Sequence, residues 1–551
     1  MHADEILIFV LAAVAVVIVV RWISEKTGLP AAALLTLIGI GYAFLPGPNV
    51  ELEPQLILTF VIPPLLYHAA LNSSLIDIRR NMRTVISLSV ALVLVTAMLI
   101  GVGFSLWVAG ATLAAGVALG AAVAPPDPVA ALAVGRKAGL PNNLVTLIQG
   151  EGLLNDATAL TILGVATAAA AGTEFTFPNA VGAFVVSAVG GVLVGIVVAW
   201  VIRLLRPFRV DPLSANALSL ATPFAAYLLA EEIQVSGVLA VVVAGLIIGH
   251  DAPRMASGAS RLQTSAVWRL VDFLLEGLVF LLIGQQVPTV VEELSRYETS
   301  TIVIAVAITV GVTLLLRPLW LVLTQLLPRS MHTRLGGEAA AEGSGTDRRE
   351  REKRREKPLS GREVTALSWA GTRGVISLAA IFTLPIGFPD RELLHFCALV
   401  VVLVTLIGQG LTFAPLVRWL GLRANEADKA RIRNEARSAS VQAAIDRLDE
   451  IKLQQHDHVE DHAIDTMHKN LETRLERYRR RLDMLEKSDS DQVPDSPQYE
   501  AALMVRRAVI DAQREELLRW RDAGRLSDQG LRVLERELDH EELLLPKRPG
   551  G

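Results

Sequence analysis

The stretch Gln149-Gly150-Glu151-Gly152-Leu153-Leu154-Asn155-Asp156-Ala157-Thr158 decides the class of this protein. It places two acids and an asparagine inside an otherwise apolar segment, from about Leu144 to Ala171, that is long enough to cross a bilayer. A carboxylate at membrane depth costs about 2.5 kcal/mol or more, so such residues usually face a cavity or a partner and mark an ion pathway. The stretch therefore predicts a membrane protein that moves a cation or a proton.

The composition divides the chain into two parts. The chain is 52% hydrophobic with a mean hydropathy of +0.44, and yet 20% of its residues are charged. Residues 1–422 alternate apolar runs with short polar loops, whereas residues 423–551 are charged throughout. We predict an all-α protein with a polytopic membrane domain at 1–422 and a helical tail at 423–551. The tail is either a regulatory or dimer-contacting domain or a solvated appendage.

Apolar runs and loop charges predict the membrane topology. We interpret residues 6–22 as a retained first helix, because no basic region precedes them. With the N-terminus outside, basic residues collect in the inward loops, including the strongly basic loop 328–362, and every neighbouring pair of loops satisfies the positive-inside rule. We therefore expect a multi-pass protein of the plasma (bacterial inner) membrane with a cytoplasmic tail. The thirteen candidate spans are 6–22, 30–46, 52–71, 83–108, 112–134, 142–171, 179–203, 212–231, 235–249, 266–287, 301–327, 363–385 and 392–420.

The fifth span is interrupted by Pro125-Pro126-Asp127-Pro128. Prolines such as Pro126 and Pro128 lack the backbone donor and stop a helix from continuing regularly. The freed backbone groups are tolerated at membrane depth only where they line a cavity or are buried in protein. Asp127 could cap the second half-helix, whose N-terminus favours an anion, and it could also take part in an ion site.

Asp156 in the sixth span is the predicted carrier group. Proton and cation compete for one desolvated carboxylate, and that competition is the chemistry of antiport. Asn155 does not titrate but can orient Asp156 or offer an oxygen. Glu151 and Asn155 share a helix face, while Gly152 and Asp156 lie on the adjacent one.

The twelfth span buries an arginine in Thr372-Arg373-Gly374. An unpaired guanidinium at that depth is costly, so Arg373 needs an acid, and Glu151 is the leading candidate. The rival interpretation is an anion-binding arginine. The flanking glycines indicate a second broken or closely packed helix. His68 in the third span is either a pH-sensing group or a hydrogen-bonded packing residue.

These motifs resemble cation:proton antiporter family 1, the Na+/H+ exchangers, in its bacterial branch. The resemblance covers residues 1 to about 422. It includes Pro-Pro-Leu-Leu in span three, Asp127-Pro128, the Glu151 to Asp156 run, Val235 to Ala240, and Gly371-x-Arg373-Gly374.

The resemblance implies about thirteen helices with inverted repeats, two crossing discontinuous helices (spans five and twelve) and a homodimer. It implies that Asp156 binds cation and proton, that Asp127 and Asn155 are further ligands, and that Glu151 pairs with Arg373. Asn155, where electrogenic relatives carry aspartate, implies electroneutral exchange. Relatives tend to have an acid at His68, a threonine at Pro126 and a serine at Gly152, so these positions leave the choice among Na+, Li+ and K+ open.

Two other functions fit the same residues. One is a non-transporting pH or ion sensor that signals through the tail, and the other is an organic-anion symporter with Arg373 as its anion site. Neither the tail nor the basic loop shows a nucleotide-binding loop or a catalytic constellation. We therefore expect no enzymatic activity, no cofactor, no metal centre and no nucleic-acid partner, with membrane lipid, the transported cation and H+ as the partners.

Overall fold

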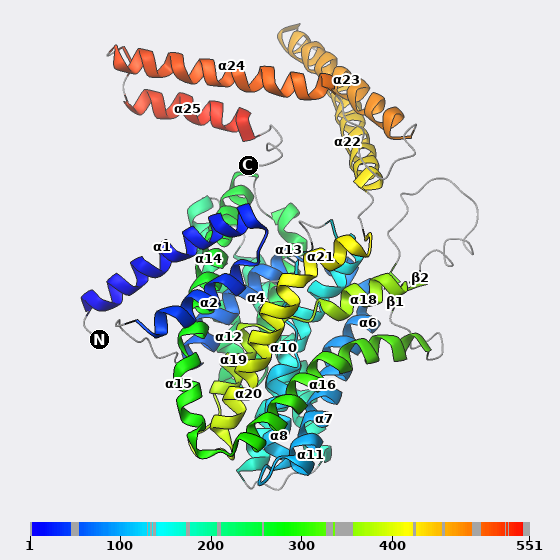
Figure 1. Cartoon of the computed structure of the whole chain (residues 1–551). Coiled ribbons are helices and arrows are strands. Elements are labelled where there is room, and N and C mark those ends of the chain that lie inside the picture. The colour runs from blue at the N-terminus through cyan, green and yellow to red at the C-terminus, as the bar shows by residue number, and fades with distance from the viewer. Residues whose placement is uncertain are drawn as a thin grey trace. The chain divides into compact units, whose positions relative to one another are not determined.

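The computed structural model is built almost entirely of helices (Figure 1). It describes residues 3–45, 54–128, 131–132, 135, 139–171, 177–205, 211–255, 258–326, 334–336, 356–422, 426–454, 458–486, 497–523, 525–526 and 528–543. The helices of the first 422 residues are α1 (Ala3–Thr27), α2 (Ala31–Ala43), α3 (Pro54–Leu56), α4 (Ile62–Leu71), α5 (Leu75–Arg80), α6 (Met82–Ile86), α7 (Leu92–Trp107), α8 (Leu113–Val123), α10 (Asn142–Ala170), α11 (Phe177–Leu204), α12 (Pro212–Glu232), α13 (Gly237–Met255), α14 (Gly258–Gln285), α15 (Val287–Glu292), α16 (Thr299–Leu326), α18 (Gly361–Trp369), α19 (Val375–Phe382), α20 (Arg391–Leu403) and α21 (Gly410–Trp419).

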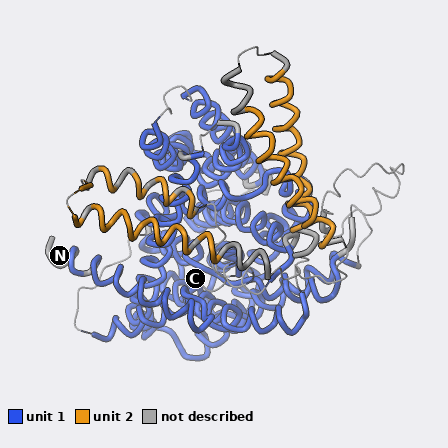
Figure 2. Tube along the Cα trace, turned by 90° about the horizontal axis from the view of Figure 1, so that it is seen from above, with its two compact units in different colours: residues 1–424 blue, residues 425–551 orange. Residues whose placement is uncertain are grey.

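The chain divides into two compact units, residues 1–424 and 425–551 (Figure 2). Four helices are described in the second unit. They are α22 (Glu426–Gln454), α23 (His458–Glu486), α24 (Pro497–Asp522) and α25 (Asp528–Leu543). Val441 and Ile445 of α22 pack on Leu475 of α23, so an apolar stripe joins this pair of helices in an otherwise charged segment.

Helices lie where the apolar runs predict them. Each of the thirteen candidate spans overlaps a helix, and spans five and twelve are the interrupted ones. Within the described residues, six helices are long and apolar enough to cross a membrane, and four shorter apolar helices accompany them. The chain is thus a multi-pass membrane protein, while the count of thirteen crossings and the inverted repeats remain predictions.

The basic loop contains the two strands of the described part. β1 (Arg334–Gly336) pairs antiparallel with β2 (Glu356–Pro358), with Leu335 opposite Lys357. Residues 328–333 and 337–355 of the predicted loop, which include its Arg- and Lys-rich run, lie outside the described residues.

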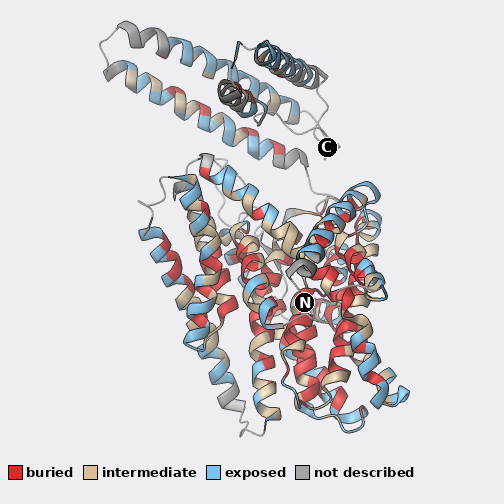
Figure 3. Cartoon of the chain, turned by 90° about the vertical axis from the view of Figure 1, so that its left-hand side faces the viewer, coloured by how far each residue is buried: buried red, intermediate tan, exposed pale blue. Residues whose placement is uncertain are grey.

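Prolines and glycines shape the helices that surround the centre of the first unit. A π-helical turn at Ile57–Val61 comes just before Pro63 and Pro64, whose rings crowd the preceding turn. Gly39 of α2 lies against Gly284 of α14 so closely that a Cβ on either would overlap the backbone of the other helix. Buried positions gather along the inner helices of the first unit (Figure 3). The result is close packing between α2 and α14 in the first unit.

Candidate functional site

The two helix breaks meet at their backbones. α8 ends at Val123, and Pro128 is helical again; α18 ends at Trp369, and α19 begins at Val375. The N–H of Asp127 donates to the carbonyl of Thr372 at 2.6 Å, and the Thr372 hydroxyl donates to the carbonyl of Asp127 at 3.0 Å. These reciprocal bonds satisfy backbone groups that the breaks set free, as membrane depth requires. Spans five and twelve therefore contact each other through their interruptions.

The Asp127 carboxylate lies beside the start of α19. Its Oδ2 occupies the space that a Cβ on Gly374 would need, and Gly374 is the residue that precedes the first turn of α19. A helix N-terminus carries a partial positive charge that favours an anion. The predicted cap on the half-helix that follows Asp127 involves N–H groups of residues 129–130, which lie outside the described residues.

Asp156 and Asn155 lie at the same depth on α10. Both are buried, with Asn155 at 0% and Asp156 at 5% exposure. The Asn155 Nδ2 donates to the carbonyl of Pro126 at 2.9 Å, which ties α10 to the first break. Because a carbonyl can only accept, this bond also identifies the amide nitrogen, and the remaining Oδ1 is a buried acceptor with no hydrogen-bond donor among the described residues.

Asp156 has no neutralising partner in the described part of the chain. No hydrogen bond or ion pair joins it to another described residue, and its electrostatic neighbour is the like charge of Asp127. Buried charges are ordinarily paired, because an unpaired one is costly. A buried carboxylate next to a second acid and an amide oxygen without a donor is a set of oxygen ligands that a proton or a hard monovalent cation would satisfy.

Gly152 serves close packing. A Cβ on Gly152 would overlap the ring of Pro128, so α10 and the helix after the first break approach each other at this point. Gly152 and Pro128 are thus complementary, and the absence of a side chain at 152 is what lets the proline lie against α10.

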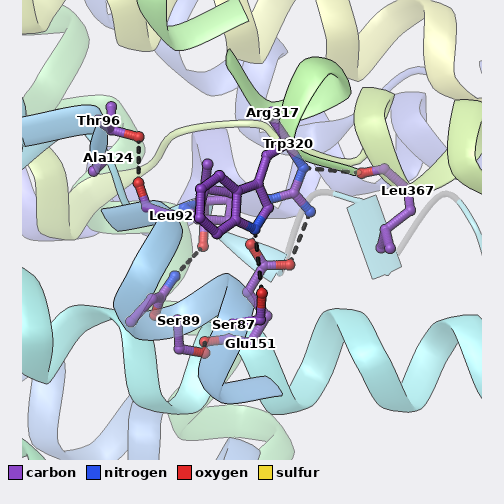
Figure 4. Close-up of polar contacts among 12 residues, drawn as sticks. Ser87, Ser89, Leu92, Thr96, Ala124, Glu151, Arg317, Trp320 and Leu367 are labelled. Carbon is purple, nitrogen blue, oxygen red and sulfur yellow. Dashed lines mark hydrogen bonds and ion pairs between the residues drawn. The ribbon is translucent and has the colours of Figure 1, made fainter. Parts of the chain in front are cut away.

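The predicted Glu151–Arg373 ion pair is wrong. Glu151, 1% exposed, binds Arg317 of α16 in a bidentate ion pair, with Arg317 Nη2 donating to Oε2 at 2.8 Å (Figure 4). Arg317 Nε also donates to the carbonyl of Leu367 at 2.9 Å. The sequence signal for Arg317 was an arginine followed by Pro318 inside an otherwise apolar span, and the pairing joins residues 166 positions apart.

Arg373 binds backbone carbonyls instead of an acid. Its Nε donates to Val123 O at 2.9 Å, its Nη2 to Ala124 O at 3.1 Å, and its Nη1 to the carbonyl of Gly371. Val123 and Ala124 end α8, where carbonyls lack intrahelical donors and carry a partial negative charge. The breaks themselves therefore supply the partners of Arg373, which is why it needs no carboxylate.

His68 contacts an acid that sequence reasoning missed. Its Nδ1 lies 3.2 Å from Oδ2 of Asp272 on α14, and its ring stacks on Trp268 with centroids 5.9 Å apart. Glu276, one turn beyond Asp272, is an electrostatic neighbour of both Asp272 and Asp127. Asp272 and Glu276 are acids four residues apart in the predicted span 266–287, and that spacing was the signal that could have found them.

A substitution at Gly374 tests whether the contact between the two helix breaks matters for transport. Gly374→Ala should reduce transport on the order of 100-fold, because its Cβ would displace the Asp127 carboxylate and small misplacements in a site have such effects. Gly361→Ala is the matched control, since a Cβ there meets open space at the start of α18. Equal transport by both variants in purified, folded form would show that the Gly374–Asp127 contact does not matter.

Interrupted helices that meet around a buried, unneutralised carboxylate are the architecture of ion-coupled secondary transporters. The chain belongs to the sodium/hydrogen exchanger family, because the model described as "Sodium/hydrogen exchanger, transmembrane" matches residues 12–419. The resemblance read from the motifs is thereby confirmed.

Individual relatives agree with the family. The "Uncharacterized Na(+)/H(+) exchanger Rv2287" of Mycobacterium tuberculosis is 32% identical over 98% of this chain and 96% of its own length. The sodium, potassium, lithium and rubidium/H(+) antiporter of Bacillus pumilus is 31% identical over 68% of this chain and 56% of its own. The solved sodium proton antiporter MjNhaP1 of Methanocaldococcus jannaschii matches with a TM-score of 0.57 at 17% identity, covering 76% of this chain and 99% of that chain, so it supports the fold.

Proposed function

We propose that this protein is a secondary active transporter that exchanges Na+ for H+ across a bacterial plasma membrane, with Li+ and K+ as alternative cations. The exchange is electroneutral and proceeds by alternating access on the single carboxylate of Asp156. The observation that carries the proposal is that, among the residues the structure describes, buried Asp156 has no countercharge and the neighbouring Asn155 Oδ1 has no donor. Family membership and the names of the relatives support the same reading.

The roles of the site residues follow from their surroundings. Asp156 carries either the proton or the cation, since both neutralise the same group and exclude each other. Asn155 Oδ1 and the carboxylate of Asp127 are the further cation ligands. Glu151 and Arg317 neutralise each other and hold α10 against α16, so neither is available as carrier.

Arg373, the anion site of the organic-anion alternative, is already engaged in other hydrogen bonds. All three nitrogens of the Arg373 guanidinium donate to carbonyls, so an organic anion would have to replace bonds that already exist. The sensor alternative would require an output module, and the four described tail helices form apolar or charged helix pairs without an evident one. We propose in addition that the chain is a homodimer in lipid, with its N-terminus outside and its tail in the cytoplasm.

Proton flux from acid-loaded proteoliposomes tests the proposal. External Na+, Li+, K+ and choline are added in turn, with the membrane voltage clamped at two values. We expect at least one alkali cation to trigger proton efflux at a rate that does not depend on voltage, while choline does nothing. Efflux that changes with the clamped voltage would overturn electroneutrality, and no efflux with any cation from folded protein would overturn antiport.

A further inference from the structure

A cavity of about 220 Å³ lies between the ends of four helices. Leu71 and Asn72 end α4, Gly249 and Ala252 lie near the end of α13, and Ser260 and Arg261 lie in the first turn of α14. The start of α12 and further residues of α4, α13 and α14, among them His68 and Trp268, form the rest of the wall. The cavity is large enough for several water molecules, at about 30 Å³ each, and its mostly apolar wall includes the polar side chains of Asn72, Ser260 and Thr264, which can bind water.

One wall of the cavity is a cluster of aromatic rings, in which His68 stacks on Trp268. Trp268 lies 5.3 Å from Tyr67 and 5.9 Å from His68, centroid to centroid, and its Nε1 donates to Ser219 Oγ at 2.9 Å. The stack fixes the His68 ring, whose Nδ1 points to Asp272 at 3.2 Å. His68 therefore forms cavity wall on one side and an ion pair on the other.

The same face of α14 leads from the cavity to the helix breaks. Trp268, Asp272 and Glu276 follow one another at intervals of four residues, so they form a row about 12 Å long. Glu276 at the far end interacts electrostatically with Asp127, whose backbone is bonded to the second break. A cation that enters the cavity would thus pass Asp272 and Glu276 before it reaches the breaks.

The cavity lies at the predicted inner side of the membrane. The loops that adjoin it follow α4, precede α12 and connect α13 to α14, and all three carry the arginines that the positive-inside rule places in the cytoplasm. The positive-inside rule places all four helix ends on the same side of the membrane, as a single vestibule requires.

Asp272 is the acid in direct contact with His68. Among the described residues, the one ion pair of His68 is with Asp272. Glu231 and Glu232 end α12 at the side opposite the cavity, and Glu151 is bound to Arg317. Among the side chains that the structure describes, the other charged or titratable groups on helices packed against α4 are Arg261, Arg269 and Glu276 of α14, His250 and Asp251 of α13, Tyr227 of α12 and Asp156 of α10.

We propose that this cavity is the inward vestibule of the transport pathway and that the His68–Asp272 pair is its pH-sensitive gate. Imidazole is the side chain that changes charge between about pH 5 and 8. When His68 is protonated it holds Asp272 and repels an entering cation, and when it is neutral Asp272 attracts the cation into the row that ends at Glu276. The proposal rests on the proposed cation/proton exchange and adds a control point on the inner side.

Cysteine labelling tests the vestibule. The chain has one cysteine, Cys397, which is buried, so Cys397→Ala gives a clean background. Ala215→Cys places a thiol in the cavity wall, and Leu229→Cys on the same helix is the control, because Leu229 is 56% exposed away from it. A charged, membrane-impermeant thiol reagent should label Ala215→Cys from the inner side and leave Leu229→Cys unlabelled. Labelling of Ala215→Cys from the outer side, or no labelling, would overturn the vestibule.

The inner-side KM for the cation tests the gate. Competition at one carboxylate raises this KM by at most about tenfold per unit fall in pH, and a protonated His68 adds to that rise. We compare the ratio of the KM at about pH 6 to the KM at about pH 8 in the two proteins. In His68→Asn this ratio should be smaller than in the wild type by roughly fivefold or more. His250→Asn, an exposed histidine on α13 outside the cavity lining, should keep the wild-type ratio.

A second variant separates the gate from a structural role. Asp272→Asn removes the attracting charge while His68 stays. Because Asp272 attracts the cation when His68 is neutral, KM should rise most at alkaline pH, whereas His68→Asn should lower KM most at acid pH. If both variants raise KM equally at all pH values, the pair is structural and the gate is wrong. If the wild-type protein shows no cation-dependent proton flux, the proposed exchange fails instead, so the two failures are distinguishable.

Discussion

Asp156→Asn should abolish cation-triggered proton flux, reducing it to the level of empty liposomes. The amide has the shape of the carboxyl group but can neither carry a proton nor neutralise a cation, so both halves of the exchange are lost. Because burying an amide there costs less than burying an unpaired carboxylate, the variant should fold at least as well as the wild type. Flux is measured with a trapped pH-sensitive dye, and folding is checked by thermal unfolding in detergent.

The matched control is Glu232→Gln, which makes the same acid-to-amide change at an exposed position at the end of α12. It should exchange at the wild-type rate. Substantial exchange by folded Asp156→Asn would remove Asp156 from the mechanism and with it the single-carboxylate reading.

Breaking the Glu151–Arg317 pair should have the largest effect on stability. Glu151→Gln leaves the guanidinium of Arg317, 3% exposed, without its countercharge, and removal of one partner of a buried pair costs about 3–5 kcal/mol. We expect a lower unfolding temperature and a smaller yield of folded protein after extraction into detergent.

A double substitution tests the identity of the partner. Glu151→Leu with Arg317→Met removes both charges and fills similar volume, which often restores stability. Glu151→Leu with Arg373→Met leaves Arg317 unpaired and should not restore it. Restoration by the second pair and failure of the first would return Arg373 to the role that the sequence predicted.

The helices and their interruptions could be predicted from the sequence because they depend on local properties. Apolar runs set the helices, and Pro126, Pro128 and Gly374 mark the places where regular hydrogen bonding stops. The family motif likewise directed attention to Asp127, Asn155 and Asp156, which lie around one point. Their roles in transport remain predictions, whereas their proximity is a property of the fold.

The partners of buried charges could not be predicted in the same way. The choice of Arg317 over Arg373 depends on which faces of α10 and α16 meet, and that is set by packing between residues 166 positions apart. A buried arginine also does not need an acid as its partner. At a helix break, free carbonyls are equally good acceptors, and Arg373 uses three of them. The partner of His68 is Asp272, an acid within the largely apolar span 266–287, and no local pattern in the sequence links the two residues.

The backbone bonds between the two breaks have a consequence for how this protein can change over generations. Asp127 and Thr372 are joined through main-chain N–H and carbonyl groups as well as a hydroxyl, and Asn155 and Arg373 also bind carbonyls. Main-chain atoms persist through every substitution that the helix path tolerates. Descendants can therefore exchange side chains around the site, and with them the preferred ion, while inheriting the same crossing. The preferred ion can therefore change while the fold stays the same, because side-chain atoms determine the ion and main-chain atoms hold the crossing together.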